Sequence, residues 1–177
     1  MKTPRLFFLA CLLICPAIGR AEGLTSVEIN LVPSVQLHPT NYSVQSFRWD
    51  IIYGVNEDVQ GLDLGFVNYA YGGEHGVELG LFNQVDKDFG GLQLSLLNQV
   101  KRHAKGVQIG ALANVDGLSF DGLQAAVFYN GTEEQMHGLQ VGLINHAGSL
   151  YGIQIGLLNF NDDSKYVGFL PFINAAF

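Results

Sequence analysis

The side chains best suited to metal binding or proton transfer in this 177-residue sequence are five histidines. Paired metal-ligating histidines often stand on one helical face, as in a His-x-x-x-His motif, and this sequence has no such pair. We therefore expect these side chains to lie in turns and at strand ends, and we predict no metal ligand among them. They are His38, His75, His103, His137 and His146.

Three short acidic stretches are the other potential cation ligands, because carboxylate oxygens are the donors that Ca²⁺ and Mg²⁺ prefer. They are Asp86 with Asp88, Glu133-Glu134 and Asp162-Asp163. Each stretch stands among turn-forming residues, so we interpret it as solvated turn charge. The sequence predicts no metal-binding residue here.

A catalytic site is also difficult to assemble from these residues. A small lipid-acting enzyme would need a Ser or His with an acidic partner. Ser119 and His137 are the available candidates, but nothing in their spacing brings them together. The sequence contains neither a Gly-x-Ser-x-Gly elbow nor a phosphate-binding Gly-x-x-x-x-Gly-Lys loop. We predict no enzyme, no catalytic residue and no cofactor.

Composition excludes several classes of protein. The chain is 48% hydrophobic and only 14% charged, which excludes a disordered chain and a coiled coil. Its formal net charge of −7 argues against a nucleic-acid partner, because phosphate binding needs a basic surface.

The N-terminal residues resemble a cleavable secretory signal peptide. Lys2 and Arg5 precede an apolar run over 6–18, and small residues stand at the −3 and −1 positions before Glu22. The apolar run is too short for a transmembrane helix, which needs about 20 residues. We predict a signal peptide over 1–21 and a single repeat-built β domain over 22–177.

Both cysteines of the chain, Cys11 and Cys15, fall inside the predicted signal peptide. A lipoprotein signal would use Cys11, but Phe8 is a poor residue at that place in such a signal. The exported chain would then have no disulfide, no thiolate metal site and no cysteine nucleophile.

The exported chain is built from a repeat of the form Gly-Leu-Gln-x-Gly-Leu-x-Asn, which occurs seven times. The first two units carry Asp63 and Glu78 in place of the Gln, and Ala125 and Ala126 interrupt the fifth. The units begin 14 to 16 residues apart and span 61–68, 76–83, 91–98, 106–114, 122–130, 138–145 and 152–159.

Each unit predicts a β-strand. Apolar residues alternate with Gly, Gln or small residues, and this period of two is typical of a strand. Turn-rich stretches of four to seven residues separate the units. Residues 25–32 and 43–55 read as further strands, which gives about ten strands in all.

An up-and-down antiparallel β-barrel is the first architecture that fits this pattern. The Leu, Ile and Val face would contact lipid, and the Gly and Gln face would point into the narrow barrel. The last strand, which ends at Phe177, resembles the C-terminal strand of bacterial outer-membrane β-barrels, because apolar residues recur at every second position back to Phe169.

A β-solenoid of 15-residue coils is the alternative architecture. Identical residues of successive units would then stack into a Gln ladder and an Asn ladder. Leu139, Val141 and Leu143 would pack inside, and Gly142 would lie on the outer surface. The stretches between strands supply only a weak second series of apolar residues, so we favour the barrel. That series is Phe89, Ala104, Phe120, Met136 and Leu150.

The repeat units resemble those of bacterial surface-repeat proteins, over about residues 61–177. The resemblance implies a place at the cell envelope and supplies no catalytic residue. We therefore expect a structural or adhesive protein of the bacterial outer membrane, with membrane lipid and the barrel-assembly machinery as partners and an unassigned surface ligand. The alternatives are a periplasmic or secreted solenoid that acts as a binding module, and a small lipid-acting barrel enzyme.

Overall fold

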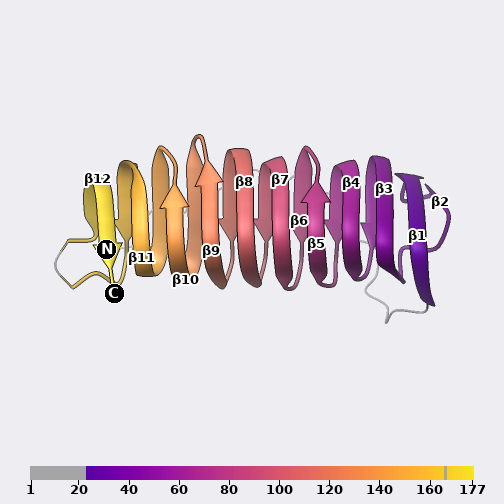
Figure 1. Ribbon diagram of the computed structural model, residues 1–177, viewed down its shortest axis with the longest axis horizontal. Helices are drawn as coiled ribbons and strands as arrows, with labels where there is room; N and C mark the ends of the chain where they lie inside the picture. Colours follow the sequence, from indigo (N-terminus) through magenta and orange to yellow (C-terminus); the bar gives the residue numbers. More distant parts are fainter. Residues whose placement is uncertain (1–22, 166) are drawn as a thin grey trace.

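The computed structural model describes residues 23–165 and 167–177, and these form an elongated β-solenoid of about nine turns (Figure 1). No helix occurs in these two ranges, so none of their residues forms a helix that could cross a membrane. The predicted signal peptide lies outside the described residues. The expectation of an all-β fold is confirmed.

Twelve strands make up the described chain and belong to one sheet that winds around the solenoid. Their bounds are β1 Gly23–Val32, β2 Val35–Gln36, β3 Tyr42–Asn56, β4 Val59–Ala70, β5 Glu74–Leu79, β6 Phe82–Val85, β7 Phe89–Val100, β8 His103–Asp116, β9 Ser119–Ala126, β10 Tyr129–Val141, β11 Ile144–Asn161 and β12 Phe169–Ala176.

Successive units pair in parallel and in register, and this shows that the preferred barrel prediction is wrong. Gly76 pairs with Gly91, Gly91 with Gly106, and the other repeat positions follow the same rule. A barrel meander would pair neighbouring strands antiparallel and would place each Gln opposite a different residue type. Parallel coils stack each residue on its own counterpart, so the amide side chains can bond to one another.

The first glycine of each unit adopts a backbone conformation that L side chains rarely reach. Its φ is positive in all seven units, for example 125° at Gly106 and 128° at Gly138. A Cβ atom on Gly138 would lie 2.1 Å from the carbonyl oxygen of Gly122 in the preceding coil. Glycine is therefore required at this bend for both backbone and steric reasons.

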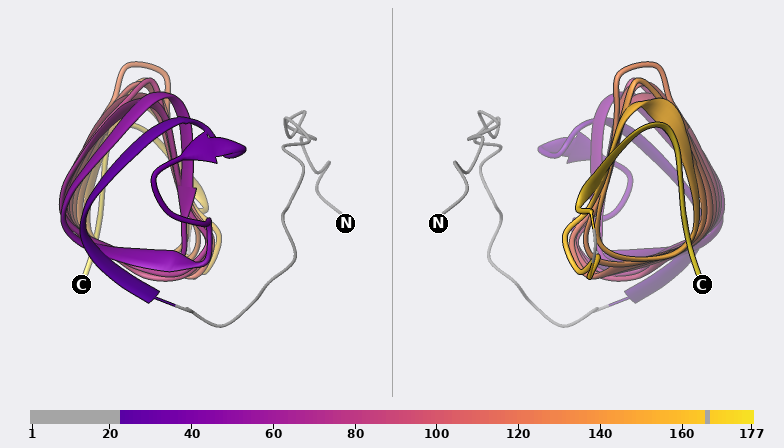
Figure 2. Two further views of the ribbon diagram at one scale, coloured as in Figure 1. Left: turned by 90° about the vertical axis from the view of Figure 1, so that its right-hand side faces the viewer. Right: turned by 90° about the vertical axis from the view of Figure 1, so that its left-hand side faces the viewer.

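The cross-section of the solenoid is a rounded triangle (Figure 2). Its small apolar core is formed by buried residues that stack along the axis next to columns of polar side chains. All five members of the second apolar series, which the barrel prediction treats as too weak for a solenoid, belong to this core. The core residues are Val44, Val59, Ala70, Val85, Phe89, Val100, Ala104, Phe120, Met136, Ala147 and Leu150.

The predicted orientation of the repeat strands in a solenoid is also wrong. Val141 and Leu143 are 36% and 40% exposed, whereas Gln140 between the repeat's apolar positions is fully buried. A Cβ on Gly142 would lie 2.7 Å from the side-chain nitrogen of Asn130, so this glycine faces the interior. The solenoid thus buries its amides and exposes its leucines, which is the polarity expected for the barrel.

The two ends of the solenoid depart from the parallel rule. β2 folds back antiparallel on β1, and β12 runs antiparallel to β11. Pro171 lies in β12, where a missing backbone N–H suits an edge strand. Phe177 is 83% exposed, and its ring lies 5.8 Å from that of Tyr151. The C-terminal strand therefore closes one end of the stack.

Candidate functional site

A ladder of glutamines runs through the interior. Each Gln donates a hydrogen bond from its side-chain nitrogen to the residue one coil closer to the N-terminus. The Gln108–Gln93 distance is 2.8 Å, the Gln140–Gln124 distance is 2.7 Å, and Gln93 donates to Glu78 at 2.6 Å. All five glutamines are fully buried. The burial is tolerated because every amide is hydrogen-bonded.

A ladder of asparagines runs beside it in the opposite sense. Asn83 donates to Asn98 at 3.0 Å, Asn98 to Asn114 at 2.8 Å, and Asn114 to Asn130 at 2.9 Å. Several also donate to a backbone carbonyl, as Asn114 does to Ala125 at 2.9 Å. Both ladders were expected for the solenoid, and both are confirmed.

Toward the N-terminus, the glutamine ladder is replaced by charged residues. Arg48, Asp63 and Glu78 occupy the ladder positions of three successive coils and are fully buried. The guanidinium of Arg48 donates to both carboxylate oxygens of Asp63 and lies 3.2 Å from a carboxylate oxygen of Asp50. Glu74, on the wall of the same coil as Glu78, completes the group.

We refer to Asp63, Glu74 and Glu78 as the carboxylate cluster. Each offers one oxygen, and the three oxygens lie within 4.8 Å of one another. Burial raises the pKa of Glu74 and Glu78 well above its usual range, and the nearby carboxylates raise it further. Burial also raises the pKa of Asp50 to about 7, although Arg48 opposes this.

A further buried acid, Asp116, lies farther along the axis. It accepts hydrogen bonds from Gln108 at 3.0 Å and from Gln124. Burial raises its pKa to about 8, while the two amide donors act in the opposite direction. The equivalent positions in the neighbouring coils hold Val100 and Thr132, so this carboxylate is an isolated feature of one coil.

Asp116 should make the solenoid less stable as the pH rises. The unfolded chain ionises this group near pH 4, whereas the folded chain resists ionisation until about pH 8. The free energy of unfolding should therefore fall between these values by about 1.4 kcal/mol per pH unit for this residue, as an upper bound. Urea unfolding should give a smaller difference in the free energy of unfolding between pH 5 and pH 8 for Asp116→Val than for the wild-type chain. An equal difference in the variant and in the wild type would show that Asp116 is already ionised in the folded chain at pH 5.

The outer surface carries the apolar residues of the repeat in three columns along the axis, which we call the apolar sides. In one coil these residues are Val107, Ile109 and Leu112, and the latter two are 43% and 41% exposed. Neighbouring coils place the same residue types beside them. The first two columns contain 62, 77, 92, 107, 123, 139 and 153, and 64, 79, 94, 109, 125, 141 and 155. The third contains 66, 81, 96, 112, 128, 143 and 157, which lie where backbone hydrogen bonds such as Leu81 N–H to Phe66 O and Phe128 N–H to Leu112 O join adjacent coils.

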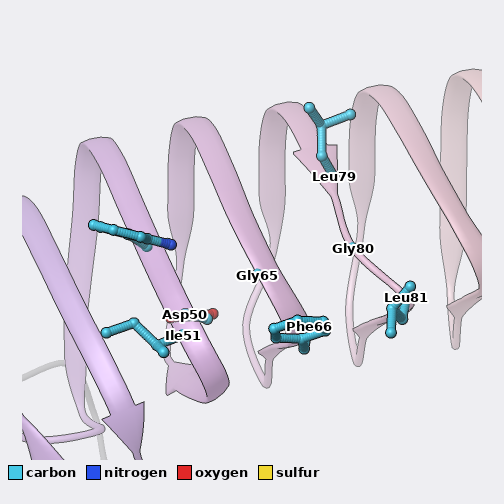
Figure 3. A pocket seen from close by; sticks show the side chains of 8 residues that line it. Asp50, Ile51, Gly65, Phe66, Leu79, Gly80 and Leu81 are labelled. Atoms are coloured by element: carbon cyan, nitrogen blue, oxygen red, sulfur yellow. The ribbon is translucent and has the colours of Figure 1, made fainter.

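An open groove interrupts the apolar sides near the N-terminal end. It lies between the coils of β3, β4 and β5, and apolar atoms form most of its walls. Figure 3 shows Phe66 and Leu81 projecting from adjacent coils at its lower rim, with Leu79 above them. Asp50 is the charged residue of the lining, and the remaining lining residues are glycines and apolar side chains, so the groove offers mainly apolar contact area.

The turns between the strands form a charged edge that also runs along the axis. Its residues stack in register, and Lys101 pairs with Asp86 at 2.6 Å. In each coil the chain leaves this edge, crosses the apolar sides and returns to the edge. The charged edge comprises Glu57, Asp58, Asp86, Lys87, Asp88, Lys101, Arg102, Glu133, Glu134, Asp162 and Asp163.

The histidines and the serine that the sequence offers for chemistry form separate pairs rather than one site. The ring Nδ1 of His103 is 2.8 Å from the hydroxyl of Ser119, but His137 pairs with Asp121 at 3.0 Å. Ser119 and His137 are therefore not partners. His146 lies 3.1 Å from Asp162, so one acidic pair contacts a histidine at the surface. These contacts are exposed and separate, and no Ser-His-acid arrangement occurs among the described residues.

The sequence pattern alone does not predict the carboxylate cluster, although it marks two of the three members. Asp63 and Glu78 were visible as departures from Gln. Glu74 can be recognised as an exception only when the coils are aligned, because its counterparts Val59 and Phe89 in the adjacent coils are apolar. Comparisons of the chain with protein-family models, with curated proteins and with solved structures found no match.

Proposed function

We propose that this chain is a non-enzymatic binding module of the cell envelope that attaches to a lipid surface through its apolar sides. The observation that carries the proposal is the inverted polarity of the solenoid, with hydrogen-bonded amides inside and leucines outside. Exposed apolar patches larger than a few hundred square ångströms are uncommon on soluble monomers and mark interaction surfaces.

Lipid suits this surface better than a protein partner does. In a lipid environment polar groups must find partners inside the protein, and both amide ladders meet this condition. The apolar columns also continue across a bend of the chain, from Leu79 to Leu81 (Figure 3). A fluid acyl layer can follow such a bend, whereas one flat protein surface would cover a single side.

The charged edge sets the orientation of the bound molecule. It follows the whole axis rather than one end, so an end-on insertion would bury charges such as Lys87 and Glu133. Lying along the surface, the solenoid keeps this edge in water and places the apolar sides among the acyl chains, as an amphipathic helix does. The signal peptide predicted over 1–21 and the resemblance to surface-repeat proteins support an envelope location.

Binding should be strongly weakened by polar residues on the apolar sides. Leu143→Ser, Ile155→Ser and Leu157→Ser change side chains that are 40%, 43% and 53% exposed. Each removes about 1 kcal/mol of burial in lipid, so together they remove about 3 kcal/mol and should weaken binding about 100-fold. The measurement is co-flotation of the exported chain with neutral phosphatidylcholine vesicles, at low and high salt.

The matched control changes three charged residues outside the apolar sides, through Lys105→Ser, Glu133→Ser and Glu134→Ser. This variant should float as the wild type does, and salt should have little effect because the contact is apolar. Failure of the wild-type chain to float would contradict the proposal. So would a stable dimer that buries the same leucines, which would identify a second copy as the occupant.

A further inference from the structure

The carboxylate cluster holds more negative charge than its surroundings neutralise. Besides Asp63, Glu74 and Glu78, Asp50 is buried beside it, and Arg48 is the one basic side chain that pairs with these acids among the described residues. Arg48 is committed to Asp63 and Asp50 through the contacts described above. The remaining carboxylates therefore lie in a closed interior without a cationic partner at hydrogen-bond distance.

Glu74 provides a second, separate observation. Its position in the other coils is apolar, with Val59 on one side and Phe89 on the other, so the fold does not need a carboxylate there. Its Oε2 has no hydrogen-bond partner and lies 4.0 Å from the Arg48 guanidinium. The side chain is fully buried and directed toward the oxygens of Asp63 and Glu78. Glu78 likewise has an Oε1 without a partner.

We propose that Asp63, Glu74 and Glu78 bind one hard divalent cation, Ca²⁺ or Mg²⁺, inside the solenoid. The spacing of their oxygens permits contact with a single ion, since two ligands on opposite sides of Ca²⁺ lie about 4.8 Å apart. An all-oxygen donor set favours these ions over Zn²⁺, which is most often held by nitrogen and sulfur. The inference is independent of the proposed binding to lipid.

The ion would enter as the chain folds, because the three carboxylates are closed off from solvent in the folded coil. Its charge would also offset the repulsion among the acids, and this would allow Glu74 and Glu78 to stay ionised. The cation would then tie two adjacent coils together, since Asp63 belongs to β4 and both glutamates belong to β5.

The test is to unfold the exported chain, refold it at neutral pH with either EDTA or a millimolar excess of Ca²⁺ or Mg²⁺, and dialyse it. Elemental analysis should find one equivalent of Ca²⁺ or Mg²⁺ retained after refolding with that ion. The midpoint of thermal unfolding should be about 5–10 °C higher than in EDTA. Retention of neither ion by the wild-type chain would overturn the proposal.

Two variants and one control separate a specific site from general charge effects. Glu74→Val restores the residue type of the neighbouring coil, and Glu78→Gln restores the ladder residue, so both are expected to fold. Each should lose the retained ion and the thermal shift. Asp116→Val removes a buried carboxylate elsewhere and should keep both. Equal ion retention by wild type and Glu74→Val would also overturn the assignment.

Discussion

Replacing Gly138 with alanine should destabilise the solenoid by about 3–5 kcal/mol and prevent folding if the chain is marginally stable. Gly138 has a φ of 128°, and a Cβ there would lie 2.1 Å from the carbonyl oxygen of Gly122. The neighbouring coil cannot move away without breaking the parallel hydrogen bonds of β9 with β10. Urea unfolding followed by circular dichroism measures the loss.

Gly168 offers the matched control for this substitution. A Cβ on Gly168 would come no closer than 3.5 Å to the nearest atom, the carbonyl oxygen of Asn161, which is an ordinary contact. Gly168→Ala should therefore change the free energy of unfolding by less than about 1 kcal/mol. Equal and small effects at Gly138 and Gly168 would show that the coils are not packed at the distance described.

Replacing Gln124 with alanine should cost a similar amount, about 3–5 kcal/mol, for a different reason. Gln124 donates to Gln108 at 3.1 Å and to Asp116, and it accepts from Gln140 at 2.7 Å. Alanine would leave buried polar groups unpaired on both sides and a cavity between the coils. The free energy of unfolding, taken from urea titration at pH 5, checks this value.

Gln99 provides the same chemical change at an exposed site. It lies in β7 on the outer surface, so Gln99→Ala removes no interior hydrogen bond and should alter stability by less than about 0.5 kcal/mol. If Gln124→Ala were as mild as Gln99→Ala, the glutamine ladder would contribute nothing to the stability of the interior.

The repeat and its strands could be predicted from sequence, but the way the strands pair could not be settled by alternation alone. Leu139, Gln140 and Val141 have the same period of two in a barrel and in a solenoid. The evidence for the solenoid was the identity of stacked positions, which a meander does not require. A solenoid interior was assumed to be apolar, and the hydrogen bonding of buried Gln140 to Gln124 shows why that assumption fails.

Predicting the carboxylate cluster requires an alignment of the coils outside the repeat units, and the sequence alone does not give this alignment. Asp63 and Glu78 stand at a repeat position and could be noticed as exceptions. Glu74 precedes its unit and reads as part of a turn until its partners Val59 and Phe89 are known. Its burial follows from the three-dimensional path of β5, because a side chain at a bend can face either solvent or the axis.

The parallel register also makes the molecule extensible in whole units. Each coil from β7 to β11 presents to the next the same glycine, the same amides and similar outward apolar residues, and units of 14, 15 and 16 residues are accommodated within one stack. Duplication or loss of one unit would lengthen or shorten the solenoid by about 4.8 Å and leave the contacts between the other coils unchanged. Gain or loss of repeats in the gene would therefore change the area of the apolar sides in equal steps.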